Sequence, residues 1–186
     1  MMILIDDNIY GFDLQEALQD ISPERREKAL LFKHDLGKRT CVLAYQLLKH
    51  ALREEYGIIE NPVLGYEEHG KPYLVDHPDI FFNLSHCSKA VACVVSNKPV
   101  GIDIETIGRM KNSIMRYTMN DNECREIMND EAPEVAFTRL WTMKEALLKL
   151  SGEGLHNDMK QVLVGSQHIF TTTECIQKGY VYTLCE

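Results

Sequence analysis

Basic side chains are in short supply in this chain of 186 residues, where 20 lysines and arginines face 28 aspartates and glutamates. The formal net charge is −8, and the deficit is even: 11 basic and 15 acidic residues lie up to Lys98, with 9 and 13 after it. A nucleic-acid-binding surface needs a basic excess. We therefore expect no nucleic-acid partner.

Long apolar runs are missing as well. The longest, such as Val91–Val95, fall far short of the roughly 20 residues that span a bilayer. The first seven residues, Met1–Asp7, contain no basic region and reach acidic side chains at once, so they do not resemble a signal peptide. We expect neither a membrane partner nor secretion.

Paired cysteine and histidine motifs are also absent. The six cysteines include no C-x-x-C pair, and Cys41, Cys93 and Cys185 lie among apolar residues. A chain of this length does not need disulfides to fold, so the cysteines are expected to be reduced, as in the cytoplasm. The seven histidines form no H-E-x-x-H or Cys/His cluster, which argues against a zinc site.

Hydrophobic residues make up 45% of the chain, enough for a sizeable core. Periodicity and end signals predict helices from Pro23 to about Asp35, from Gly37 to Gly57 and from Pro133 to Gly152. Strands are predicted over 2–5, 80–84, 91–95, 100–104, 162–164, 168–171 and 180–185, with a turn at 70–72 and a loop with a broken helix over 106–132. Helices and strands do not alternate regularly, which favours an α+β fold.

Two carboxylates stand out in the stretch Val100–Glu105, which contains the predicted strand 100–104. Asp103 and Glu105 are two residues apart, so they project from one face while Ile102 and Ile104 face the core. Parallel carboxylates repel one another unless a cation lies between them. An isolated pair of this kind is also typical of a solvated strand edge.

A second candidate lies on the last predicted helix, in Trp141–Lys149. Glu145 and Lys149 are four residues apart and adjacent on the helix surface, which is typical of an ordinary exposed ion pair. Glu145, however, lies beside Trp141 and Leu148, at the edge of the stripe that the helical period predicts: Phe137, Leu140, Trp141, Lys144, Leu147 and Leu148. A partly buried acid flanked by lysines is a candidate functional residue.

The third candidate is Ser85-His86, at the end of the predicted strand Phe81–Leu84. The pair offers a hydroxyl and an imidazole, although a polar strand end capped by its own hydrogen bonds would look the same. No G-x-S-x-G motif surrounds Ser85, which argues against a hydrolase nucleophile. No G-x-x-x-x-G-K-[ST] loop is present, so phosphate would have to be held by side chains and metal.

Together these stretches resemble a known family. The sequences G-I-D-I-E and, about forty residues later, W-T-M-K-E-A-L-L-K are similar to the signature of 4′-phosphopantetheinyl transferases. The likeness extends, in order and spacing, to the longer Sfp-type branch. It covers about residues 20–155 and includes the segments 21–28, 38–40, 70–72 and 82–86.

The resemblance implies a pseudo-dimer of two similar α+β halves, 1–98 and 99–186, with coenzyme A bound between them. It implies transfer of 4′-phosphopantetheine from coenzyme A to a serine of an apo acyl or peptidyl carrier protein, with release of adenosine 3′,5′-bisphosphate. The carriers would belong to fatty-acid, polyketide or nonribosomal peptide synthases. The enzyme would be a monomer that depends on Mg²⁺, with Mn²⁺ as the alternative.

The resemblance also assigns residues. The metal ligands would be Asp103, Glu105 and Glu145. The catalytic residues would be Glu145, which takes the serine proton, Lys149, which stabilises the leaving group, and His86. Coenzyme A would be contacted by Arg25, Lys28, Arg39, Lys71, Pro72, Ser85, His86 and Lys144. Two departures stand out, because Arg25 replaces a frequent lysine and the segment Cys87–Ala90 lacks the expected aromatic residue.

Two rival functions use the same residues. One is a metal-dependent phosphohydrolase or nuclease, and the other is a family member that binds carriers without modifying them. The segment Arg109–Met119 carries three basic residues and three methionines. It either docks a carrier protein or packs a helix onto the core.

Overall fold

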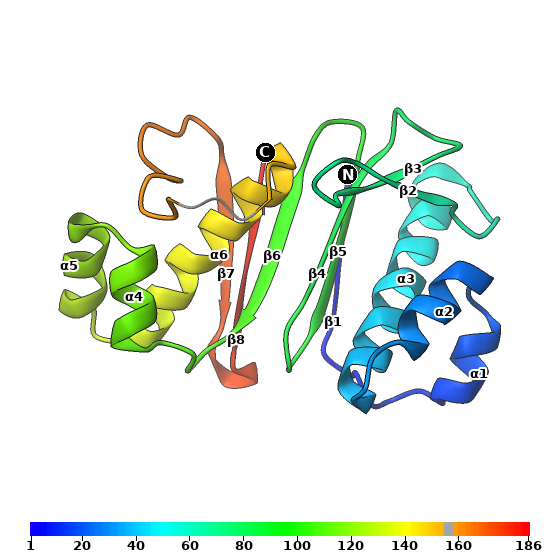
Figure 1. Ribbon diagram of the computed structural model, residues 1–186, viewed down its shortest axis with the longest axis horizontal. Helices are drawn as coiled ribbons and strands as arrows, with labels where there is room; N and C mark the ends of the chain where they lie inside the picture. Colours follow the sequence, from blue (N-terminus) through cyan, green and yellow to red (C-terminus); the bar gives the residue numbers. More distant parts are fainter. Residues whose placement is uncertain (155–157) are drawn as a thin grey trace.

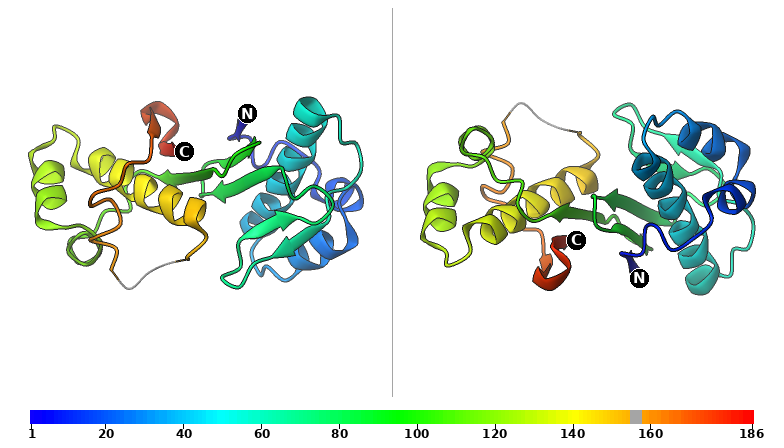
Figure 2. Two further views of the ribbon diagram at one scale, coloured as in Figure 1. Left: turned by 90° about the horizontal axis from the view of Figure 1, so that it is seen from above. Right: turned by 90° about the horizontal axis from the view of Figure 1, so that it is seen from below.

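The computed structural model describes residues 1–154 and 158–186, which form two three-stranded antiparallel sheets lying side by side. Helices cover the outer side of each sheet, so that α1–α3 lie at one end of the molecule and α4–α6 at the other (Figures 1 and 2). The mixed α+β architecture predicted from the sequence is confirmed. None of the described helices is long and apolar enough to cross a membrane.

The first half is built around the sheet β1-β5-β4. Its strands are β1 (Met2–Asp6), β4 (Phe81–His86) and β5 (Val91–Ser96), and its helices are α1 (Leu14–Gln19), α2 (Pro23–Leu30) and α3 (Asp35–Tyr56). A separate hairpin joins β2 (Leu64–Tyr66) to β3 (Pro72–Leu74). The long helix α3 packs Leu48 and Leu52 against Cys93 and Val95 of β5. Because β5 is buried along its whole length, it forms the centre of this half.

The second half is built around the sheet β6-β8-β7. Its strands are β6 (Gly101–Thr106), β7 (Phe170–Cys175) and β8 (Tyr180–Cys185), and its helices are α4 (Asn112–Thr118), α5 (Asp121–Asn129) and α6 (Pro133–Ser151). A short 3₁₀ turn, Ile176–Lys178, joins β7 to β8. The main elements repeat the order of the first half: a strand, a long helix and two further strands, with the last strand in the middle of the sheet.

The two sheets meet where β4 lies beside β6 (Figure 1). Side chains rather than a backbone ladder connect these strands. The Ile102 amide donates to Asn83 Oδ1, and the Ile104 amide donates to Ser85 Oγ. Both N···O distances are 3.2 Å. The two acceptors are two residues apart on β4, as are the two donors on β6. We call this junction of β4 and β6 the seam. Along it, buried side chains of the first half accept hydrogen bonds from backbone amides at the edge of β6.

Gly101 brings β6 close to α6. A Cβ atom at this position would lie 2.0 Å from the Ala146 carbonyl oxygen and 2.8 Å from the Leu150 amide nitrogen. Both are backbone atoms of α6, so no rotamer change could relieve the contact. The glycine at this position lets the strand that carries Asp103 pack directly on the helix that carries Glu145 and Lys149.

Several predicted elements need correction. Residues 162–164 lie in a succession of turns, not a strand: Val164 is exposed and Leu163 packs against the α4–α6 core. The first predicted helix ends at Leu30, and α3 begins at Asp35, so Gly37 lies inside a helix. The segment 106–132 forms two helices, because Asn120 and Glu123 make a reciprocal capping box that starts α5. The prediction missed α1 and the β2–β3 hairpin.

The methionines of the segment 109–119 belong to the core. Met115 and Met119 are buried against Ile127 and Phe137. The alternative of helix packing is therefore confirmed for these methionines, while docking by the exposed Arg109, Lys111 and Arg116 stays a prediction. Every one of the six cysteines is a free thiol, as the sequence predicted.

Candidate functional site

A cavity of about 330 Å³ opens at the seam between the two halves, and we call it the seam pocket. Three elements line it: the end of β4, the polar end of β6 and the middle of α6. Its lining residues are Leu84, Ser85, His86, Asp103, Ile104, Glu105, Trp141, Glu145 and Lys149. The structure thus gathers the three stretches that the sequence singled out into one pocket.

The centre of the seam pocket is a three-residue contact between Ser85, Asp103 and Lys149. The Lys149 ammonium lies 2.6 Å from Asp103 Oδ1 and 2.7 Å from Ser85 Oγ. The Ser85 hydroxyl donates to the same Asp103 oxygen over 2.7 Å. Ser85 and Asp103 are both buried, whereas the Lys149 side chain is 28% exposed.

The other two carboxylates of the pocket have different surroundings. Glu105 accepts a hydrogen bond from Arg109 at 2.6 Å. Burial raises the pKa of the Glu145 carboxyl, and the negative charges of Asp103 and Glu105 raise it further, while Lys149 partly offsets them. The pKa of Glu145 is therefore raised both by its burial and by two further carboxylates that line the same pocket.

These carboxylates suit a hard cation. Among residues 1–154 and 158–186, no three His, Cys, Asp or Glu side chains lie close enough to form a ready-made metal site. Magnesium, however, is commonly held by one or two carboxylates together with substrate phosphates and water. The chemistry of the donor set fits that pattern, because carboxylates from β6 and α6 face one cavity.

A second cavity, of about 270 Å³, continues from the seam pocket toward the β2–β3 hairpin, and we call it the hairpin pocket. It shares Leu84, Glu145 and Lys149 with the seam pocket and adds His69, Gly70, Lys71, Pro72, Asn83, Leu148, Gly152 and Gly154. Lys71 donates to the Leu150 carbonyl oxygen over 2.6 Å at the end of α6. Burial lowers the pKa of the Lys71 ammonium.

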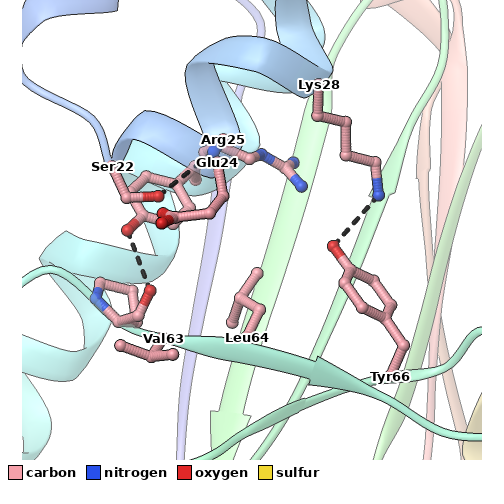
Figure 3. Close-up of a pocket in the computed structure, with 9 residues that line it drawn as sticks. Ser22, Glu24, Arg25, Lys28, Val63, Leu64 and Tyr66 are labelled. Carbon is pink, nitrogen blue, oxygen red and sulfur yellow. Dashed lines mark hydrogen bonds between the residues drawn. The ribbon is translucent and has the colours of Figure 1, made fainter.

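A third cavity, also about 270 Å³, lies between α2 and the strand β2, and we call it the α2 pocket (Figure 3). Arg25 and Lys28 extend into it from α2, and Lys28 donates to the Tyr66 hydroxyl over 3.2 Å (Figure 3). Ser22 starts α2 by accepting from the Arg25 amide, which fixes where these cations emerge.

His86 connects the α2 pocket to the seam pocket electrostatically. Although the residue is exposed, partial desolvation lowers the pKa of its imidazole, the charges of Lys149 and Arg25 lower it further, and Asp103 partly offsets them. Because like charges from both pockets act on this ring, a bound anion there would meet cations from α2 and α6 together.

Two predicted contact residues lie elsewhere. Lys144 has no exposed surface; its ammonium donates to Glu123 over 2.8 Å and to the Met159 carbonyl over 2.7 Å. Its assignment as a phosphate contact is therefore corrected, because the ammonium is buried and already paired with Glu123 and the Met159 carbonyl. Arg39 donates to Asp35 and to the Phe12 carbonyl and does not line any of the three pockets described.

Some lining residues were missed by the sequence interpretation. Tyr45 and Tyr66 line the α2 pocket, and Asn83 lines the hairpin pocket. Only Asn83 carried a usable signal, because it lies two residues before Ser85 and so shares a strand face with it. The tyrosines come from α3 and β2, which sequence spacing does not relate to α2.

Known proteins resemble this chain over most of its length. Residues 99–184 match the family model of the "4'-phosphopantetheinyl transferase superfamily". The 4'-phosphopantetheinyl transferase Sfp of Bacillus subtilis (strain 168) is 32% identical over 159 residues, which cover 79% of this chain and 71% of that relative. The relative named 4'-phosphopantetheinyl transferase ffp, from Bacillus subtilis, is 27% identical over 203 residues, covering 95% and 91% of the two chains.

The chain belongs to the 4′-phosphopantetheinyl transferase superfamily, in which it resembles the Sfp-type members of Bacillus. A further 4'-phosphopantetheinyl transferase of Bacillus subtilis is 32% identical over 138 residues, or 73% of this chain. The match covers 62% of that relative, so the chain spans less than two thirds of its length.

Proposed function

We propose that this protein transfers 4′-phosphopantetheine from coenzyme A to a serine of an apo carrier protein. The observation that carries the proposal is the seam pocket, where Asp103, Glu145 and Lys149 meet beside His86. The names of the relatives support the same reaction. The carriers would be those of fatty-acid, polyketide or nonribosomal peptide synthesis.

Phosphate binding would be divided between the pockets. Arg25 and Lys28 are basic side chains lining one pocket, and they suit the 3′-phosphate of coenzyme A. His86 would join them, because a neighbouring dianion favours the protonated imidazole, which desolvation and the charges of Lys149 and Arg25 disfavour. Lys71 and Pro72 of the hairpin pocket would contact the nucleotide, and Lys149 would contact the pyrophosphate.

Asp103, Glu105 and Glu145 would hold Mg²⁺, or Mn²⁺ in its place. When bound, the ion would neutralise charge on the pyrophosphate and on the carboxylates. Asp103 is suited to such a role, because both of its hydrogen bonds from Ser85 and Lys149 fall on Oδ1. Among the described residues no hydrogen bond is made to its other oxygen, Oδ2.

Glu145 would accept the proton of the carrier serine, directly or through water. Its raised pKa suits a general base better than that of an ordinary glutamate, since efficiency is greatest when the pKa approaches the working pH. The serine oxygen would form a bond to the phosphorus that carries the pantetheine arm. The bond from that phosphorus to adenosine 3′,5′-bisphosphate would break, and Lys149 would stabilise the charge on this leaving group.

The proposal also concerns the whole molecule. We propose that residues 1–98 and 99–186 are the halves of a pseudo-dimer, which the repeated strand order β1-β5-β4 and β6-β8-β7 supports. Because one chain supplies both sides of the seam pocket, the enzyme would act as a monomer. Its free cysteines suit the cytoplasm.

The test is intact-mass spectrometry of a panel of apo carrier proteins incubated with the enzyme, coenzyme A and Mg²⁺. We expect a carrier to gain one phosphopantetheine, and we expect chelation of the metal or Asp103→Asn to abolish the gain. Release of inorganic phosphate without a heavier carrier would instead indicate a phosphohydrolase. Binding of coenzyme A with neither product would indicate a carrier-binding protein without activity.

The 3′-phosphate assignment has its own test. Dephospho-coenzyme A should be a poorer donor than coenzyme A, and Lys28→Ala should narrow the difference in kcat/KM between the two donors. Lys33→Ala is a control that removes a nearby exposed charge from outside the α2 pocket. An unchanged donor ratio in Lys28→Ala would refute the role of Lys28.

A further inference from the structure

Ser85 uses every hydrogen-bonding position of its hydroxyl. A serine hydroxyl has one donor and two acceptor positions. Ser85 donates to Asp103 Oδ1 over 2.7 Å and accepts from the Lys149 ammonium over 2.7 Å and from the Ile104 amide over 3.2 Å. These three partners lie on β6 and α6, whereas Ser85 itself lies on β4 in the other half of the molecule.

This saturation leaves Ser85 little capacity to contact a nucleotide. Its side chain is 6% exposed, and a phosphate oxygen could bind it only by displacing one of the three partners. The bonds instead act on Asp103 and Lys149. They hold one carboxylate oxygen, Oδ1, and so fix the rotation of the carboxylate that leaves Oδ2 for another ligand.

We propose that Ser85 is a positioning residue, which sets Asp103 and Lys149 relative to each other across the seam rather than binding coenzyme A. The inference rests on the proposed function for its kinetic consequences, since Asp103 would bind the metal and Lys149 the pyrophosphate. The positions of Asp103 and Lys149 depend only on residues of this chain, so an experiment that needs no activity can test them.

Asn83 offers a matched control on the same strand face. Like Ser85 it is buried and accepts from a β6 amide over 3.2 Å, in this case Ile102. Its described hydrogen bonds include none to Asp103 or Lys149. Substitution of either residue by alanine removes the acceptor of one β6 amide, but only Ser85→Ala also removes a hydrogen bond from Asp103 and one from Lys149.

The kinetic experiment compares wild type, Ser85→Ala, Ser85→Thr and Asn83→Ala, and measures carrier modification against Mg²⁺ and coenzyme A concentration. We expect Ser85→Ala to lower kcat by about tenfold or more, since misplaced reacting groups cost that much. We expect the Mg²⁺ concentration for half-maximal rate to rise, with the KM for coenzyme A at saturating Mg²⁺ unchanged. Ser85→Thr, which keeps the hydroxyl, should restore the Mg²⁺ dependence. Asn83 lines the hairpin pocket, so Asn83→Ala should act on the KM for coenzyme A and not on the Mg²⁺ dependence.

The geometric experiment needs no activity. The four proteins are treated with acetic anhydride, and the rate of Lys149 acetylation is followed by peptide mass spectrometry. Lys149 loses one of two acceptors in Ser85→Ala, so its acetylation should speed up by about tenfold, the equivalent of one hydrogen bond to a charged group. The rate should stay at the wild-type value in Ser85→Thr and Asn83→Ala.

The outcomes separate the inference from the proposed function. A higher KM for coenzyme A in Ser85→Ala with an unchanged Mg²⁺ dependence would show that Ser85 contacts the nucleotide and would overturn the inference. Equal effects of Ser85→Ala and Asn83→Ala on kcat, Mg²⁺ dependence and acetylation would show that Ser85 only connects β4 to β6, as Asn83 does. That result would also overturn the inference. If wild type modifies no carrier, the proposed function fails, while the acetylation rates still decide the role of Ser85.

Discussion

Replacing Gly101 with alanine tests how closely the site strand packs on the site helix. The added Cβ would lie 2.0 Å from the Ala146 carbonyl oxygen, whereas such contacts need about 3.4 Å in a close-packed interior. Strand β6 and helix α6 would have to separate by roughly 1 Å or more at this point, because the clash is with backbone. Gly101 has no positive φ, so the substitution adds no backbone strain of its own.

The expected cost has two parts. Overpacking of this kind destabilises by about 1–3 kcal/mol, and in a domain of this size each kcal/mol lowers the melting temperature by about 2–4 °C. The same displacement moves Glu145 and Lys149 relative to Asp103, and a misplacement of about 1 Å can cost about a hundredfold in rate. We therefore expect a loss of activity out of proportion to the loss of stability.

The assay is thermal unfolding followed by circular dichroism, together with carrier modification well below the melting temperature. Gly37→Ala is the control, since its Cβ meets only the exposed side chain of Phe32, which can move, and alanine favours helix α3. That variant should be as stable as wild type or more stable. A Gly101→Ala protein with wild-type melting temperature and activity would refute the close approach of β6 to α6.

Three further substitutions test the core and the charges around the site. Lys144→Met should lower the free energy of unfolding by about 3–5 kcal/mol in denaturant, because it leaves Glu123 buried without its cation. Adding Glu123→Gln should recover part of this loss. Equal stability of Lys144→Met and wild type would contradict the buried pair. Glu145→Gln should raise the melting temperature at neutral pH, because the raised pKa of Glu145 means that ionisation costs the folded state more than the unfolded chain. That gain should vanish as the pH falls below the ordinary value of 4.5, where both states are protonated, and a gain that grows toward acid would have the wrong sign. Met115→Glu should unfold more easily by about 2–5 kcal/mol, with the exposed Arg116→Glu as the control that leaves stability near wild type.

The parts of the fold that the sequence predicted well are those with local signals. Pro133 starts α6 and Gly152, at a φ of 75°, ends it where the pattern placed the boundary. Strands β4, β5 and β6 lie within one residue or two of their predicted limits, because continuous apolar runs and the Asn97–Pro99 break define them. The three-residue strands β2 and β3 gave no comparable signal, since their stability comes from pairing with each other.

The side chains of the site were likewise predictable where the signal was local and not where it depended on packing between distant elements. Lys144 and Glu145 are neighbours in the family motif, yet successive residues on a helix point about 100° apart, so one faces α5 and the other the seam pocket. The sequence placed Lys144 in the apolar stripe, and that position, more than its charge, indicated its burial. The hydrogen bonds of Ser85 could not be predicted, because they depend on how β4 lies beside β6.

The seam has a consequence for how the protein folds. The chain passes from one half to the other between β5 and β6, and each described strand pairing stays within its own half. The contacts that build the site join residues far apart in sequence, 64 residues between Ser85 and Lys149 and 79 between Lys71 and Leu150. The sheets close loops at least as long, since β1 pairs with β5 and β6 pairs with β8. The seam, however, joins side chains of β4, β6 and α6, so it can close only after both halves have placed these elements. During refolding, secondary structure should therefore return before the seam closes, and the ability to bind coenzyme A should return last.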